Sequence, residues 1–158
     1  MGQYAVQKIK NIKLTADMES LGSLVSFVSE WARDQGMAPE RVNEIQVVLE
    51  EAFVNICKYA YAGRQGDVEV NCFSESDSTV IEIIDSGIPF DITAQALPDI
   101  TADIPERKIG GLGWLLIKSF MDMVVYRREN GKNILRLTSL LQKQETPCCH
   151  SGACPEQS

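Results

Sequence analysis

The most informative segment of this chain is Glu50-Glu51-Ala52-Phe53-Val54-Asn55-Ile56-Cys57-Lys58. In a helix it places Glu51 and Asn55 on one stripe, because residues four apart lie on the same face. Apolar residues form the opposite side and also flank this stripe, so we expect protein to cover the helix nearly all round. A carboxylate and a carboxamide in apolar surroundings need internal hydrogen-bond partners or a ligand. The segment therefore indicates a binding site.

Hydrophobic periodicity also predicts the elements around this helix. Pro39 suits its first turn, where the missing N–H of proline is not needed, and Gly63 is expected to end it. Thr15 or Asp17 can cap an earlier helix, which Gly36 ends. The other expected elements are strands over residues 4–9, 68–73, 79–84, 124–128 and 134–138, and a helix over residues 115–121.

Composition limits the function classes. The 158 residues are enough for one domain with a two-layer core. A net charge of −7 argues against nucleic-acid binding, since no basic stripe is available to neutralise phosphates. No apolar run approaches the roughly 20 residues that span a bilayer. The first residues lack the pattern of a secretory signal, so we expect a cytoplasmic protein that binds neither nucleic acid nor membrane.

The end of the sequence differs in character from the rest. Three cysteines and the only histidine gather there: Cys148, Cys149, Cys154 and His150. Their spacing matches no common zinc module, and the segment offers no core. We therefore expect a folded domain over residues 1–143 and a disordered, cysteine-rich tail over residues 144–158.

Two further segments carry weaker signals. The strand expected over residues 79–84 runs into Asp85-Ser86-Gly87-Ile88-Pro89, an acidic strand end followed by a turn. After an irregular segment over residues 92–109, Gly110-Gly111-Leu112-Gly113 opens a helix. Glycine-rich backbone at a helix start suits phosphate, because it presents free N–H groups at the positive end of the dipole. It is neither a Walker A loop nor a dinucleotide fingerprint.

Together, the three signals stand in a fixed order: Glu51-x-x-x-Asn55 on a helix, Asp85-x-Gly87-x-Pro89 after a strand, and Gly110-Gly111-x-Gly113 at a helix start. This combination resembles the N, G1 and G2 boxes of the Bergerat ATP-binding fold. Within that superfamily, residues 4–140 look like anti-sigma factor serine/threonine kinases. The resemblance implies an α/β sandwich, with helices on one face of a mixed, largely antiparallel sheet.

The resemblance also implies roles for individual residues. Asn55 would bind Mg²⁺ through its amide oxygen, and Glu51 would be the general base toward the attacking hydroxyl. Asp85 would accept the adenine amino proton, and Gly87 would let the base approach the backbone.

Other residues would serve the phosphates of ATP by the same resemblance. Residues 92–109 would form the ATP lid, and Gly110, Gly111 and Gly113 would wrap the phosphates. Arg107 or Lys108 could supply positive charge to the γ-phosphate.

The implied activity is phosphorylation of a serine or threonine of an anti-sigma-factor antagonist, by a homodimer that also holds a sigma factor. Two alternatives stay open. Lys58-Tyr59 also resembles histidine-kinase catalytic domains, but the only histidine is His150 in the tail. An ATP-binding regulatory module could instead sequester a partner without phosphotransfer. The closing hairpin departs from the family by having Asn130-Gly131-Lys132-Asn133 where glycine and threonine are expected.

Overall fold

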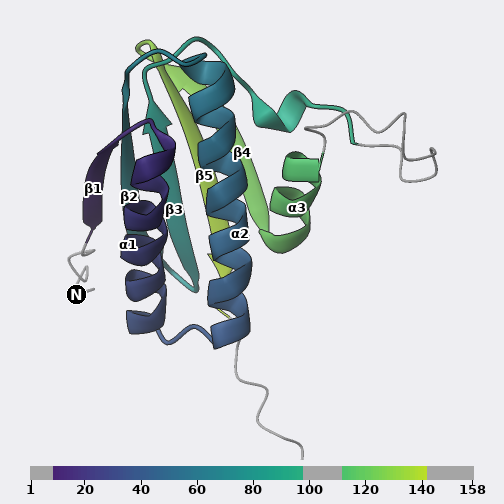
Figure 1. Cartoon of the computed structure of the whole chain (residues 1–158). Coiled ribbons are helices and arrows are strands. Elements are labelled where there is room, and N and C mark those ends of the chain that lie inside the picture. The colour runs from purple at the N-terminus through teal and green to yellow at the C-terminus, as the bar shows by residue number, and fades with distance from the viewer. Residues whose placement is uncertain (1–8, 98–111, 142–158) are drawn as a thin grey trace, which may run out of the picture.

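One five-stranded sheet carries the helices on one of its faces (Figure 1). The computed structural model describes residues 9–97 and 112–141. The strands are β1 (Lys10–Thr15), β2 (Asp67–Glu75), β3 (Ser78–Asp85), β4 (Met123–Glu129) and β5 (Lys132–Leu140). The helices are α1 (Leu21–Asp34), α2 (Pro39–Asn55) and α3 (Leu112–Phe120), with two 3₁₀ turns, η1 (Met18–Ser20) and η3 (Ile92–Ala94), and a π-helix, η2 (Ile56–Ala60).

The predicted two-layer α/β sandwich is confirmed, with one correction to the sheet. Its strands lie in the order β1-β2-β3-β5-β4, and each neighbouring pair among the described residues is antiparallel rather than mixed. Two tight hairpins contribute to this pattern, because a two-residue turn can only join antiparallel strands. Asn130 and Gly131 form one of them with φ of 50° and 75°.

The first strand differs from the prediction. Residues 4–8 of the expected strand lie outside the described residues, and Ile9 is not in a strand. The sequence analysis missed β1, in which half-buried Ile12 and Leu14 alternate with exposed neighbours. Asp17 caps η1 by accepting a hydrogen bond from the amide of Ser20 at 3.0 Å.

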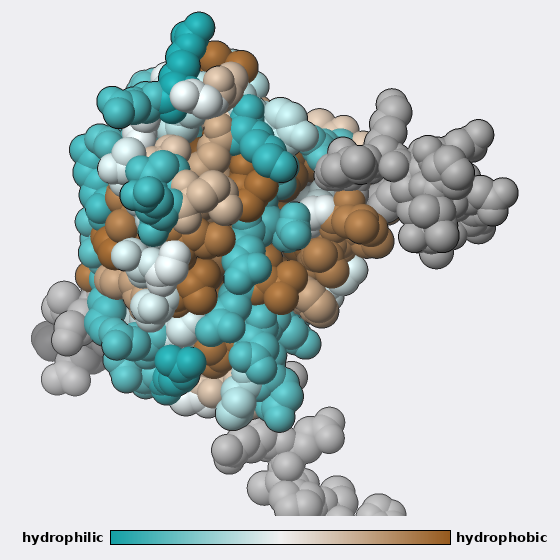
Figure 2. Space-filling view, in the orientation of Figure 1, coloured by the Kyte–Doolittle hydropathy of each residue, from teal (hydrophilic) through white to brown (hydrophobic). Residues whose placement is uncertain are grey.

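The core lies between the sheet and the helix layer. Val68, Val70 and Cys72 alternate along β2 and are fully buried against the helices. Leu49 and Phe53 of α2 are fully buried as well, and α2 contacts α1 and α3 on its two sides. Figure 2 shows that apolar surface remains over α3. No helix in the described part of the chain is long and apolar enough to cross a membrane.

The end of α2 is irregular and places the residues that follow it. The predicted helix continues past Asn55, but its last turn is the π-helix η2 rather than α-helix. The amide of Tyr61 closes this turn by donating to the carbonyl of Ile56 at 3.1 Å. Gly63 has φ of 78°, the left-handed conformation that ends helices, which confirms the predicted stop.

Candidate functional site

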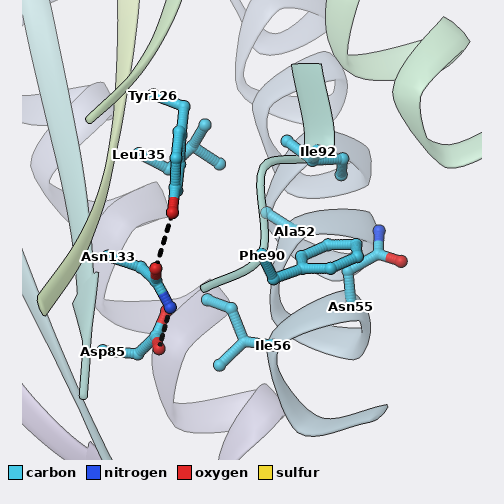
Figure 3. Close-up of a pocket in the computed structure, with 9 residues that line it drawn as sticks. All are labelled: Ala52, Asn55, Ile56, Asp85, Phe90, Ile92, Tyr126, Asn133 and Leu135. Atoms are coloured by element: carbon cyan, nitrogen blue, oxygen red, sulfur yellow. Dashed lines mark hydrogen bonds between the residues drawn. The ribbon is translucent and has the colours of Figure 1, made fainter. Parts of the chain in front are cut away.

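A pocket opens where α2, the turn after β3 and the β4–β5 hairpin meet (Figure 3). It brings together Asn55 and Asp85, which the sequence analysis assigned to one site. Its volume is about 320 Å³, open mouth included. Its lining is mainly apolar and consists of Ala52, Asn55, Ile56, Asp85, Phe90, Ile92, Tyr126, Asn133 and Leu135. A mainly apolar pocket with a few convergent polar groups is typical of small-molecule sites.

Asp85 is the buried carboxylate of this pocket, with 4% of its surface exposed. Its Oδ1 accepts hydrogen bonds from the amide of Gly87 at 2.9 Å and from Nδ2 of Asn133 at 2.8 Å. Burial raises the pKa of Asp85, because a charged carboxylate loses solvation there. The two hydrogen bonds and the positive charge of Arg128 act against that rise in pKa.

Gly87 fits against the end of the helix layer in a way that no larger residue could. A Cβ atom at Gly87 would lie 2.4 Å from the carbonyl oxygen of Ala60 and 2.5 Å from its carbon. The next amide, that of Ile88, donates to the same carbonyl at 2.8 Å. The hydroxyl of Tyr61 accepts a further bond from the amide of Ser86 at 2.9 Å. The turn that carries Asp85 is thereby attached to the end of η2.

Glu51 and Asn55 lie against the start of α3. A Cβ atom at Gly113 would be 2.7 Å from Oε2 of Glu51 and 3.3 Å from Nδ2 of Asn55. Nδ2 of Asn55 donates to the carbonyl of Glu51 at 2.7 Å, which fixes the amide. The amide group of Asn55 points away from Asp85 (Figure 3). Gly113, the last glycine of the third sequence signal, therefore meets the first signal at one end of the site, and the second signal lies at the other.

Comparison with known proteins identifies the family of this chain. The sequence profile of the histidine kinase-like ATPase domain matches residues 14–139, which include both ends of the site. The chain belongs to the histidine kinase-like ATPase family.

Similar members of this ATPase family carry informative names. The chain is 30% identical over 146 residues to "Serine-protein kinase RsbW" of Halalkalibacterium halodurans, covering 89% of each protein. It is 28% identical to the protein of the same name in Listeria monocytogenes serovar 1/2a, over 79% of this chain and 82% of that one. It is 23% identical to "Anti-sigma F factor" of Clostridium acetobutylicum, over 85% and 91%. The predicted resemblance to anti-sigma factor serine/threonine kinases is confirmed.

The residues near Asn55 fit the Mg²⁺ that a histidine kinase-like ATPase would use. Because the amide nitrogen of Asn55 faces a carbonyl, its oxygen is the atom left for a ligand. The described residues contain no group of three or more His, Cys, Asp or Glu side chains that could together hold a metal ion. Mg²⁺ does not need such a cage, since it commonly takes one or two protein oxygens and completes its shell with phosphates and water.

Several predicted site residues lie outside the described residues. These are Arg107, Lys108, Gly110 and Gly111. The expected tail, with Cys148, Cys149, His150 and Cys154, also lies outside the described residues. Most of the expected lid, residues 98–109, lies there too.

Of the nine residues that line the pocket, the sequence analysis assigned only Asn55 and Asp85 to a site, and the aromatic and polar ones that it missed are Phe90, Tyr126 and Asn133. For Asn133, the strand periodicity of the sequence did contain a signal. It is a polar residue in phase with Leu135 and Leu137 on a strand of period two, and so it faces the helix layer. Phe90 stacks on the ring of Tyr59, with centroids 5.0 Å apart, and gave no such signal.

Proposed function

We propose that the protein is an Mg-ATP-dependent serine/threonine kinase of the anti-sigma factor type. It would transfer the γ-phosphate of ATP to a serine or threonine of an anti-sigma-factor antagonist and also sequester a sigma factor. The observation that carries this proposal is the contact of Gly113 with Glu51 and Asn55, at the far end of a site whose other end holds buried Asp85. The names of the similar kinases and anti-sigma factor support it.

The base of ATP would occupy the apolar pocket. Asp85 would accept a hydrogen bond from the exocyclic amine of adenine, and the turn at Gly87 would let the ring approach the backbone. Ala52 and Ile56 of the helix layer would cover one face of the ring, which burial in an apolar pocket favours.

The phosphates would extend toward the start of α3. Its first amides and dipole favour negative charge, and Gly113 leaves room beside Glu51. Gly110 and Gly111 would contribute further amides, and Arg107 or Lys108 would add charge at the γ-phosphate. Mg²⁺, bound through Oδ1 of Asn55, would neutralise charge on the phosphates.

Glu51 would act as the general base. It would accept the proton of the incoming serine or threonine hydroxyl as that oxygen bonds to the γ-phosphorus and ADP leaves. The acceptor would come from a separate protein, the antagonist. By family resemblance we further propose a cytoplasmic homodimer that uses the first strand and helix as its contact surface.

The test incubates the protein with labelled ATP and candidate antagonists encoded beside its gene. Phosphoserine or phosphothreonine should form on one antagonist. Glu51→Gln should lose transfer while it still binds ATP, whereas Glu50→Gln, an exposed neighbour with the same change, should keep both. ATP binding with no transfer to any candidate would contradict the kinase assignment and favour a sequestering module. Full transfer by Glu51→Gln would remove the base assignment.

A further inference from the structure

The hydrogen bonds of the pocket converge on Asn133. This residue of β5 is 3% exposed. Its Nδ2 donates to Oδ1 of Asp85 and to the carbonyl of Ile88, both at 2.8 Å. Its Oδ1 accepts from the hydroxyl of Tyr126 and from Nη1 of Arg128, both at 2.7 Å. Figure 3 shows the chain of bonds from Tyr126 through Asn133 to Asp85.

These four bonds fix the orientation of the Asn133 amide. The nitrogen faces two acceptors and the oxygen faces two donors. The flipped amide would oppose like groups at three of the four contacts, since only the Tyr126 hydroxyl can also accept a bond, so the observed orientation is strongly favoured. Asn133 is therefore held as a donor toward Asp85.

Asp85 is left with one carboxylate oxygen for a ligand. Its Oδ1 already accepts from Gly87 and Asn133. Its Oδ2 has no hydrogen-bond partner within residues 9–97 and 112–141, and no fully buried polar side-chain atom there lacks a partner. Oδ2 is therefore not completely buried, and Asp85 lines the pocket.

We propose that Asn133 sets the purine selectivity of this pocket, by donating to Oδ1 of Asp85 and leaving Oδ2 as the acceptor that meets the base. The inference rests on the proposed ATP site. A purine with an amine at C6, such as adenine, donates to Oδ2. A purine with an oxygen at C6, such as hypoxanthine, places an acceptor against an acceptor and is rejected.

Protonation of Asp85 would reverse this preference. A protonated Oδ2 becomes a donor and can bond to the C6 oxygen of hypoxanthine. Burial raises the pKa of Asp85, and the bond from Asn133 opposes this rise. Loss of that bond should therefore increase the protonated fraction and weaken the discrimination between the two purines.

The experiment measures the affinities of full-length protein for ATP and for inosine triphosphate by calorimetry between pH 5 and pH 8. The wild type should prefer ATP by about 10²-fold at pH 8, the upper end of what one unpaired buried polar group costs. Asn133→Leu, which is similar in size, should reduce this ratio by at least about tenfold. Its ATP affinity should also begin to fall at a higher pH than in the wild type. Asn71→Leu, on the opposite face of the sheet, is the matched control and should change neither quantity.

A second variant covers the case in which Asn133→Leu does not fold. Tyr126→Phe keeps the ring and removes one bond to Asn133, so it should lower the ratio by about two- to fivefold. A folded Asn133→Leu with the wild-type ratio and pH profile would overturn this inference alone. If that variant does not fold, an unchanged ratio in Tyr126→Phe would overturn it. A wild-type protein that binds neither nucleotide would instead overturn the proposed function, and this inference with it.

Discussion

Gly113 at the start of α3 lies directly against the carboxylate of Glu51, one turn before Asn55 on α2. A single methyl group at Gly113 would come within 2.7 Å of Oε2 of Glu51. Residues 62 positions apart in the sequence are thus in contact at the point where the proposed reaction takes place. The contact involves the free end of a flexible side chain, so a larger residue would displace Glu51 rather than the backbone.

Gly113→Ala should therefore lower phosphotransfer without unfolding the protein. We expect about a 10- to 10²-fold loss of rate, since displacement of a catalytic group by about 1 Å can cost that much. Stability should stay the same or rise by up to about 1 kcal/mol, because alanine is the better helix former. Rate assays and thermal unfolding measure the two effects. Gly22→Ala in α1 is the control, since no atom lies within 4 Å of its added Cβ, and normal transfer by Gly113→Ala would contradict the argument.

Gly87→Ala should give the opposite result for stability. The added Cβ would lie 2.4 Å from the backbone oxygen of Ala60, which cannot move without η2. We expect a loss of about 1–3 kcal/mol in the free energy of unfolding, typical of an overpacked site. ATP affinity should fall too, because the turn that carries Asp85 must shift. Denaturant unfolding and calorimetry test this, and wild-type stability would show that the turn can move freely.

The sequence predicted those parts of the site that depend on local spacing. Glu51 and Asn55 could be placed on one stripe because a helix has a fixed period. The start of α2 at Pro39 and the stop at Gly63, after η2, could be predicted from the backbone chemistry of proline and glycine alone.

The parts that could not be predicted depend on contacts between distant segments. Asn133 meets Asp85 only because β5 pairs with β3, and no local sequence pattern predicts that pairing. The strand β1 has only two half-buried apolar residues, so its period-two pattern is short and weak. The composition of the segment after Asn55 does not predict the π-helix, whose last residue, Ala60, lies against the distant turn at Gly87.

Asp85→Asn should not destabilise the protein at neutral pH. The folded-state pKa of Asp85 is raised above its ordinary value of about 3.9, chiefly by burial. Between these two pKa values the folded state binds more protons than the unfolded state, so stability falls as pH rises through the folded pKa. The neutral variant avoids this cost, and its midpoint of unfolding at pH 7 should equal or exceed that of the wild type. The advantage should vanish below pH 4, and a deficit at pH 7 would show that the charged carboxylate stabilises the fold.

The last prediction separates binding residues from the residue that acts in the transition state. Asp85 and Asn55 would contact nucleotide or metal in the ground state, whereas Glu51 would act mainly as the hydroxyl loses its proton. Asp85→Ala and Asn55→Ala should therefore weaken Mg-ATP binding by at least about tenfold, which corresponds to about 1.4 kcal/mol. Glu51→Ala should keep affinity within about threefold and lose about 10²–10⁴ in rate.

Metal dependence makes the assignment of Asn55 specific. In the wild type and in Asp85→Ala, removal of Mg²⁺ by a chelator should weaken whatever ATP binding remains. In Asn55→Ala the same removal should change little, because the protein oxygen for the metal is already gone. Calorimetry with and without chelator measures this, with Glu50→Ala as the exposed control on the same helix. An Asn55→Ala protein that responds to Mg²⁺ as strongly as the wild type would mean that the metal is held elsewhere.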